Sequence, residues 1–100
     1  MIHEPCTMSG NKTASAVIWA RPGILGVLDL SPPTTGVVTL KIYDNASAAS
    51  GTVLARVDLP AGVVSSNNIH VGRQALLGLY AELSGTYTGT INYNIGFLAQ

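Results

Sequence analysis

The chain has little charge, a single cysteine and no long apolar run. Five Lys and Arg face five Asp and Glu among 100 residues, so no basic stripe is available to neutralise phosphates, and we expect no nucleic-acid partner. The lone Cys6 excludes an intramolecular disulfide framework and a cysteine zinc cluster, which favours assembly in a reducing cytoplasm. Every apolar segment is interrupted before the roughly 20 residues that span a bilayer, and no run of signal-peptide length begins the chain. We therefore expect neither membrane insertion nor a secretory signal.

What is present is an apolar, nearly uncharged composition. Hydrophobic residues make up 47% of the chain, charged residues 10%, and the mean hydropathy is +0.36. With a formal net charge of zero, little electrostatic repulsion keeps copies apart, and self-association or a permanent partner is expected. The length suits one domain. We expect an N-terminal arm over residues 1–12 and a single domain over residues 13–100.

Short segments rich in β-branched and aromatic residues alternate with clusters of Gly, Pro, Ser and Asn, which predicts strands and turns rather than helices. The predicted strands are 13–20, 23–30, 37–44, 52–59, 67–72, 77–84 and 87–97. The pair Gly85-Thr86 is expected to form a turn between the last two. The pattern predicts an all-β fold, an antiparallel β-sandwich of about seven to eight strands.

Period-two alternation indicates which side chains face the core. Four predicted strands place apolar residues on one face and more polar residues on the other. The outward residues are expected to include Tyr43, Tyr80, Asn92 and Asn94. The inward residues are expected to be Val38, Leu40 and Ile42; Val53, Ala55, Val57 and Leu59; Leu79, Ala81 and Leu83; and Ile91, Tyr93 and Ile95. The segment 23–30 is apolar on both faces apart from Asp29, so it is expected to be central or covered by a neighbouring subunit, with Gly26 permitting a close approach.

Groupings that could carry chemistry are sparse. His3, Glu4 and Cys6, with His70 as a fourth ligand, lack the spacing of a zinc site. Phosphate-binding glycine motifs and nucleophile elbows are absent, and nothing positions Asp58 and Glu82 as a catalytic carboxylate pair. The segment 44–51 is expected to be a hairpin loop rather than a calcium loop. We expect no enzyme, no metal and no cofactor.

An aromatic surface is the main alternative source of function. Trp19, Tyr43 and Tyr80 would form a sugar-binding platform if all three rings were exposed in a row. Trp19, which lies beside Ile18, is instead expected to be buried, and a buried indole would count against this hypothesis.

Several runs carry a resemblance to a known class of proteins. The run 38–55, VTLKIYDNASAASGTVLA, places a strand ending in Tyr-Asp before a hairpin of small residues closed by Ser-Gly-Thr. The segments 57–62, VDLPAG, and 78–86, GLYAELSGT, fit the same pattern. Over roughly residues 23 to 95 the chain resembles the small β-sandwich virion proteins of bacteriophages, of the capsid decoration or cement type.

The resemblance implies a jelly-roll-like or immunoglobulin-like sandwich that stabilises the head shell by binding the major capsid protein. It also implies a dimer or trimer on the capsid surface of the virion, assembled in the host cytoplasm, with the N-terminal arm lying along a neighbouring subunit. The residues expected to contact partners are Ile2, Met8, Tyr43, Arg56, His70 and Tyr80. The alternative function is a carbohydrate- or receptor-binding β-sandwich module of a phage tail or fibre, which would use the three aromatic rings.

Overall fold

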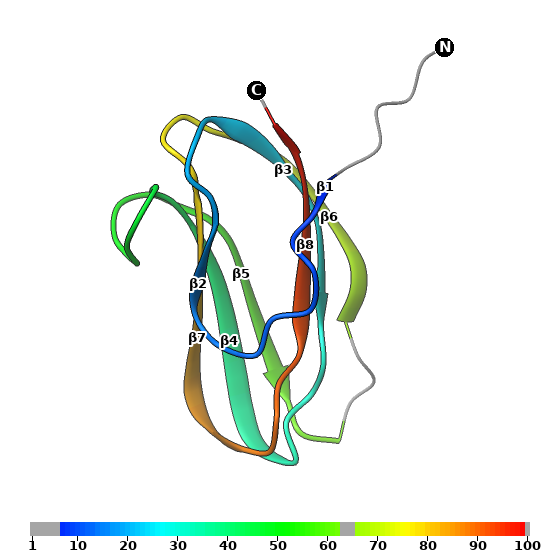
Figure 1. Ribbon diagram of the computed structural model, residues 1–100. Coiled ribbons are helices and arrows are strands. Elements are labelled where there is room, and N and C mark those ends of the chain that lie inside the picture. Colours follow the sequence, from blue (N-terminus) through cyan, green and yellow to red (C-terminus); the bar gives the residue numbers. More distant parts are fainter. Residues whose placement is uncertain (1–6, 63–65, 100) are drawn as a thin grey trace.

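The structure is a computed structural model that describes residues 7–62 and 66–99, with the backbone alone for residues 66–70. Eight strands form two four-stranded antiparallel sheets packed face to face (Figure 1). The strands are β1 (Thr7–Met8), β2 (Ala16–Trp19), β3 (Gly23–Leu30), β4 (Thr35–Asp44), β5 (Val53–Pro60), β6 (Ser66–Ala75), β7 (Leu79–Thr88) and β8 (Tyr93–Ala99). The predicted all-β antiparallel sandwich is confirmed.

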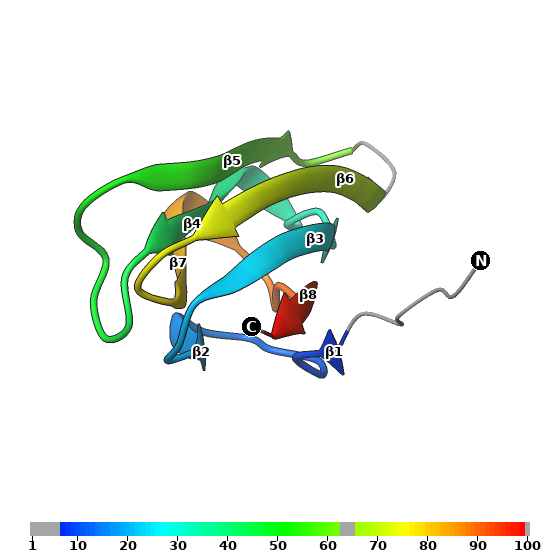
Figure 2. The same cartoon turned by 90° about the horizontal axis from the view of Figure 1, so that it is seen from above.

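The strand order identifies the kind of sandwich. One sheet has the order β1-β8-β3-β6 and the other has the order β2-β7-β4-β5. The chain therefore pairs β1 with β8, β2 with β7, β3 with β6 and β4 with β5, like one long hairpin whose successive strand pairs alternate between the sheets. This arrangement is a jelly roll and differs from the seven- or nine-stranded immunoglobulin order. Seen from above, β5 and β6 lie side by side at one edge of the sandwich (Figure 2).

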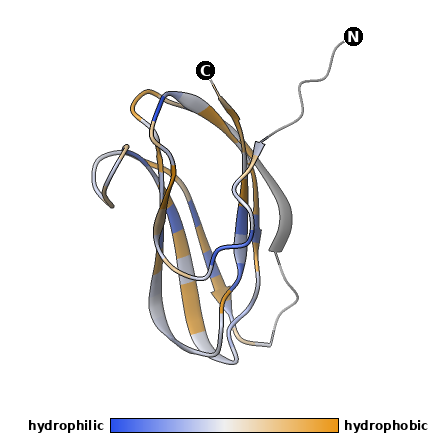
Figure 3. Cartoon of the chain, in the orientation of Figure 1, coloured by the Kyte–Doolittle hydropathy of each residue, from blue (hydrophilic) through white to orange (hydrophobic). Residues whose placement is uncertain are grey.

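The core lies between the sheets, where alternate side chains of both inner faces meet. Val38, Leu40 and Ile42 on β4 are completely buried, as the alternation predicts. Tyr93 and Ile95 on β8 are also buried, and apolar and polar residues alternate along the strands in Figure 3. Burying such side chains contributes about 1.5–3 kcal/mol each, so this interface is the main source of stability.

The apolar strand β3 is central. It pairs with β8 on one side and with β6 on the other, which explains why it carries few polar residues. Both ladders shift register between Leu25 and Val27, so Gly26 lies at a bulge. Of the two explanations for this strand, a central position within the chain's own sheet is the one observed.

The predicted inner face of β5 is wrong at its first residue. Ile42 pairs with Ala55 and Tyr43 pairs with Val53, so Leu54 is an extra residue in a β-bulge. The bulge reverses the alternation at this point, which leaves Val53 39% exposed and Leu54 only 6% exposed. Single-sequence alternation contains no signal for such an insertion.

The predicted turn at Gly85-Thr86 is also wrong, because β7 continues without a break to Thr88. Gly85 pairs with Val38 at a φ of 112°, and a Cβ at this position would collide with the carbonyl oxygen of Val37. The glycine therefore serves a close approach of two strands rather than a turn. The segment 87–97 is divided between β7 and β8, and the strand predicted over 67–72 extends over Ser66–Ala75.

The sandwich begins earlier than the predicted boundary at residue 13. Thr7 and Met8 pair with Phe97 and Gly96 of β8, and Lys12 forms a bridge with Tyr93. These pairings extend the β8 edge, so the part of the expected arm from residue 7 onward belongs to the sheet. Residues 1–6 lie outside the described part of the chain.

Candidate functional site

The outer face of the β2-β7-β4-β5 sheet brings together two tyrosines, exposed valines and charged side chains. Because the even-numbered residues of β4 from Val38 to Ile42 fill the core, its odd-numbered residues lie on the outside. We call this surface the tyrosine face. It comprises Val17 on β2; Tyr80 and Glu82 on β7; Val37, Thr39, Lys41 and Tyr43 on β4; and Val53, Arg56 and Asp58 on β5.

An aromatic and apolar row crosses this face. Tyr43 lies directly opposite Tyr80, and the outer neighbours of the two tyrosines are Val53 and Val17. The valines are 39% and 43% exposed, and both tyrosines are half-buried. Val37, further along β4, is 42% exposed on the same side. The face thus holds three of the six exposed large apolar side chains found among the described residues.

A charged row lies beside the aromatic row. Lys41 is opposite Glu82 on one side and opposite Arg56 on the other. The hydroxyl of Tyr43 donates a hydrogen bond to Glu82 Oε1 at 3.3 Å, which links the two rows. Partial burial, with the adjacent Glu82 carboxylate, raises the pKa of Tyr43. The phenol therefore stays neutral and remains a donor at physiological pH.

Asp58 belongs to a small network on the same face. The hydroxyl of Thr39 donates to Asp58 Oδ1 at 2.5 Å, and Arg56 Nε donates to Oδ2 at 3.1 Å. The Thr39 hydrogen bond, followed by the Arg56 contact, lowers the pKa of the Asp58 carboxyl. Both oxygens of this carboxylate are already engaged, and Glu82 accepts from Tyr43. The two acids thus support the surface rather than forming an open carboxylate pair.

The structure brings three of the six predicted partner contacts together. Tyr43, Tyr80 and Arg56 all lie on the tyrosine face. Met8 is on the other sheet, where it is 46% exposed on β1. His70 lies in β6 opposite Val27, with its side chain outside the described atoms, and Ile2 is outside the described residues.

The three-ring sugar platform is wrong, because Trp19 does not join the tyrosines. Val17 pairs with Tyr80 but Trp19 pairs with Leu79, and this register shift turns the indole toward the core. The indole ring packs on Phe97 with 5.2 Å between ring centroids, and its Nε1 donates to the Pro22 carbonyl at 3.2 Å. Only a pair of rings is left on the outer surface.

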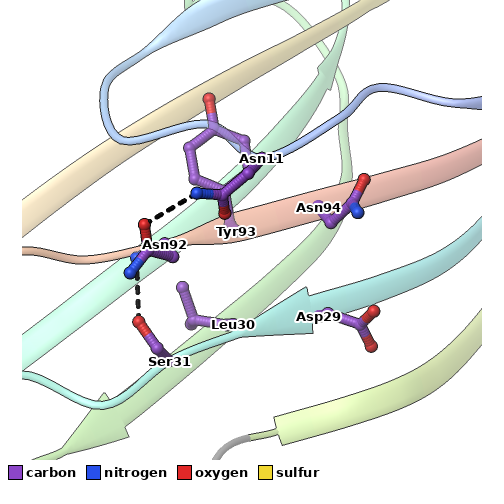
Figure 4. Close-up of a pocket in the computed structure, with 7 residues that line it drawn as sticks. All are labelled: Asn11, Asp29, Leu30, Ser31, Asn92, Tyr93 and Asn94. Carbon is purple, nitrogen blue, oxygen red and sulfur yellow. Dashed lines mark hydrogen bonds between the residues drawn. The ribbon is translucent and has the colours of Figure 1, made fainter.

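A small polar pocket opens at the other sheet, where β3 ends and β8 begins (Figure 4). Its volume is about 190 Å³, and its lining residues are Asn11, Asp29, Leu30, Ser31, Asn92, Tyr93 and Asn94. Asn11 Nδ2 donates to Asn92 Oδ1 at 2.9 Å, and the backbone N–H of Asn92 donates to Ser31 Oγ at 2.8 Å. These bonds join the loop before β2 to the end of β3 and the start of β8. Sequence reasoning placed Asn92 and Asn94 on an outer face but did not predict the pocket.

The turn between β6 and β7 exposes two leucines at the end of the sandwich. Leu76 is 66% exposed and Leu77 is 60% exposed. The Asp44 carboxylate accepts hydrogen bonds from the backbone N–H groups of Leu76, Leu77 and Gly78, at 3.1, 2.8 and 3.4 Å. Burial of the carboxyl opposes its ionisation, but these bonds outweigh it and lower the pKa of Asp44. The turn is thus held by a charge-assisted network.

The loop beside this turn is the hairpin predicted over 44–51, and it connects β4 to β5. Asn45 Oδ1 accepts the backbone N–H groups of Ser47 and Ala48, both at 2.9 Å. This Asx-type geometry explains why a short amide side chain begins the loop. In the described ranges, no group of three or more His, Cys, Asp and Glu residues can hold a metal ion, and no helix is long and apolar enough to cross a membrane.

Comparison with protein families, curated proteins and solved structures finds no match to this chain. Its class is therefore defined by the strand order alone, as an eight-stranded jelly-roll sandwich. Because one such fold supports many unrelated functions, the functional argument depends on the surfaces described above.

Proposed function

We propose that this chain is a non-enzymatic structural protein, and specifically a decoration protein that binds the major capsid protein on the head shell of a bacteriophage. The observation that carries the proposal is the turn between β6 and β7, where Asp44 holds two exposed leucines, Leu76 and Leu77, in a fixed position. The tyrosine face is a second protein-binding surface, because aromatic and arginine side chains are enriched where proteins bind one another. The resemblance of residues 23 to 95 to phage virion proteins supports the capsid as that partner.

The Leu76-Leu77 turn is the part of the molecule best suited to contact the shell. Two leucines exposed by 66% and 60% protrude where the turn is fixed by Asp44, so little conformational entropy is lost when they enter a pocket. Full burial of an exposed leucine side chain contributes about 1.5–3 kcal/mol, so these two residues can supply a substantial part of the binding free energy. A protein that binds the assembled shell and not its separated subunits stabilises the shell by mass action.

The first test is the composition of purified particles. Mass spectrometry of phage particles from cells that carry the gene should detect the chain at a fixed ratio to the major capsid protein. The second test adds the purified chain to shells that lack it and records the melting temperature of the shell. Saturating the shell at about 100 times Kd would stabilise it by about 2.7 kcal/mol per site.

A turn variant and a matched loop variant distinguish specific binding to the shell from nonspecific adsorption. The double substitution Leu76→Ser/Leu77→Ser should weaken shell binding at least tenfold, because it removes both anchors. The control Ser47→Ala/Ala48→Ser alters exposed residues of the neighbouring loop and should bind as the unmodified chain does. Absence of the chain from particles, or a shell melting temperature that does not change when the chain is added, would refute the proposed function.

A further inference from the structure

We propose that a second copy of this chain binds the tyrosine face, about a two-fold axis that runs parallel to the strands between β7 and β4. The inference deepens the proposed function, since it rests on the chain acting as an assembling structural protein and names the surface that assembles. Its basis is the self-complementary order of side chains across the four strands. In a two-fold interface each residue meets a different residue of the other copy, and that contact occurs twice.

Under this two-fold symmetry, the aromatic row of one copy lies over the aromatic row of the other. Its order across the sheet is Val17, Tyr80, Tyr43 and Val53. An axis between β7 and β4 places Tyr43 over Tyr80 of the second copy and Val17 over its Val53. Rings then meet rings and valines meet valines, so the exposed apolar surface of both copies is covered together.

The charged row is matched by the same operation. Lys41 is placed over Glu82 of the second copy, and Glu82 over its Lys41. Although these two residues are direct neighbours within one sheet, they form no ion pair in the described part of the chain, where Arg56 and Asp58 do form one. An axis perpendicular to the strands would instead place β4 over β4 of the second copy. Lys41 would then meet no acid, because the outward residues of β4 include none. The observed order of charges therefore favours the axis along the strands.

The dimensions of the face set the strength of the contact. Four strands spaced about 4.8 Å apart and up to ten residues long cover several hundred Å² of projected area. Sheets packed face to face also rotate by about 30°, which concentrates contact on the central rows. A standard interface buries about 800 Å² per partner, so the isolated dimer is expected to be weak. The concentration series must therefore extend from about 10 µM to about 1 mM, the range of weak affinities.

The test uses two charge reversals alone and mixed, measured by sedimentation equilibrium at low ionic strength. Lys41→Glu gives a face with two acids in the central row, and Glu82→Lys gives one with two bases. Each variant alone should lose self-association at least tenfold, whereas an equimolar mixture should associate as strongly as the unmodified chain or more strongly. The control Arg21→Glu reverses a charge at an exposed position off the tyrosine face and should associate normally. Circular dichroism and urea unfolding establish that each variant is folded.

If Lys41 and Glu82 only stabilised their own chain, mixing the two variants could not restore association. Restored association in the mixture is therefore explained by the dimer and not by a role within one chain. If a reversal prevents folding, Lys41→Gln and Glu82→Gln replace it. Each should weaken association alone, and their mixture should recover part of it, because the mixed dimer keeps one of the two contacts between Lys41 and Glu82. A monomer at about 1 mM, or reversals that associate as the unmodified chain does, would overturn the inference. If the chain does not form this dimer but is found on particles, the proposed function still holds. If the dimer forms but the chain is absent from particles, the proposed function is contradicted and the dimer is not.

Discussion

Tyr93 links the two sheets, and its replacement by phenylalanine should change stability in opposite directions at neutral and alkaline pH. The ring is 1% exposed, and its hydroxyl donates to the Ala14 carbonyl at 2.5 Å. Removing that hydrogen bond in Tyr93→Phe is expected to lower the free energy of unfolding by about 1 kcal/mol at pH 7. The loss is modest because Ala14 is exposed and its carbonyl can bind water instead.

At high pH the unmodified chain loses this advantage. Burial, with a smaller contribution from Tyr80, raises the pKa of Tyr93 to about 12, against about 10 in an unfolded chain. Above pH of about 10 the unfolded state releases a proton that the folded state keeps, so stability falls as the pH rises toward 12. The fall is about 1.4 kcal/mol by pH of about 11 and about 2–3 kcal/mol in all. The phenylalanine of the variant cannot ionise, and the two stability curves should therefore cross at a pH of about 11.

Urea unfolding followed through the fluorescence of Trp19, the sole tryptophan, measures both effects between a pH of about 7 and a pH of about 12. Contributions from groups that both proteins share cancel in the difference. Tyr87→Phe is the matched control, and its stability should follow the pH dependence of the unmodified chain. A stability difference between Tyr93→Phe and the unmodified chain that stays constant from pH 7 to 11 would refute the reasoning.

Three further predictions concern the turn, a strand glycine and the bulge. Asp44→Asn should lower the free energy of unfolding by about 1 kcal/mol at pH 7, a modest loss because solvent screens the carboxylate. Because the pKa of Asp44 is lowered in the folded chain, its carboxylate stabilises the fold fully at pH values above about 4, the pKa of an aspartate in an unfolded chain. The difference should thus vanish in urea titrations as the pH falls through the folded pKa, and an equal loss at pH 7 and pH 2 would contradict it. Gly85→Ala should lower the free energy of unfolding by at least about 2 kcal/mol, because the added Cβ collides with the neighbouring strand. Gly62 also has a positive φ, but a Cβ added there would have no atom within 4 Å, so Gly62→Ala should cost about 1 kcal/mol. Equal thermal shifts for these two would count against the close approach. Leu54→Ala should cost about 2–4 kcal/mol and Val53→Ala under about 0.5 kcal/mol in chemical unfolding, and the reverse order would show that the bulge is misplaced.

The candidate site was predictable only in part from the sequence. Alternation along 37–44 correctly placed Tyr43 on an outer face, and alternation along 77–84 did the same for Tyr80. Nothing in either segment states that the two strands are neighbours, so the direct pairing of the rings came from the sheet order. The exclusion of Trp19 depended on a register shift in β2, which has no signature in a single sequence.

Residue pattern was enough to define an antiparallel sandwich, the buried faces of β4 and β8, and a nearly uncharged surface. These follow from local chemistry, because side-chain alternation and turn residues act within a few positions of each other. The jelly-roll order, the bulge at Leu54, the use of Gly85 between strands and the arrangement of the tyrosine face came from the folded chain instead. Each of these depends on which distant strands pair and in which register, and that choice is made by the packing of the whole core rather than by any one segment.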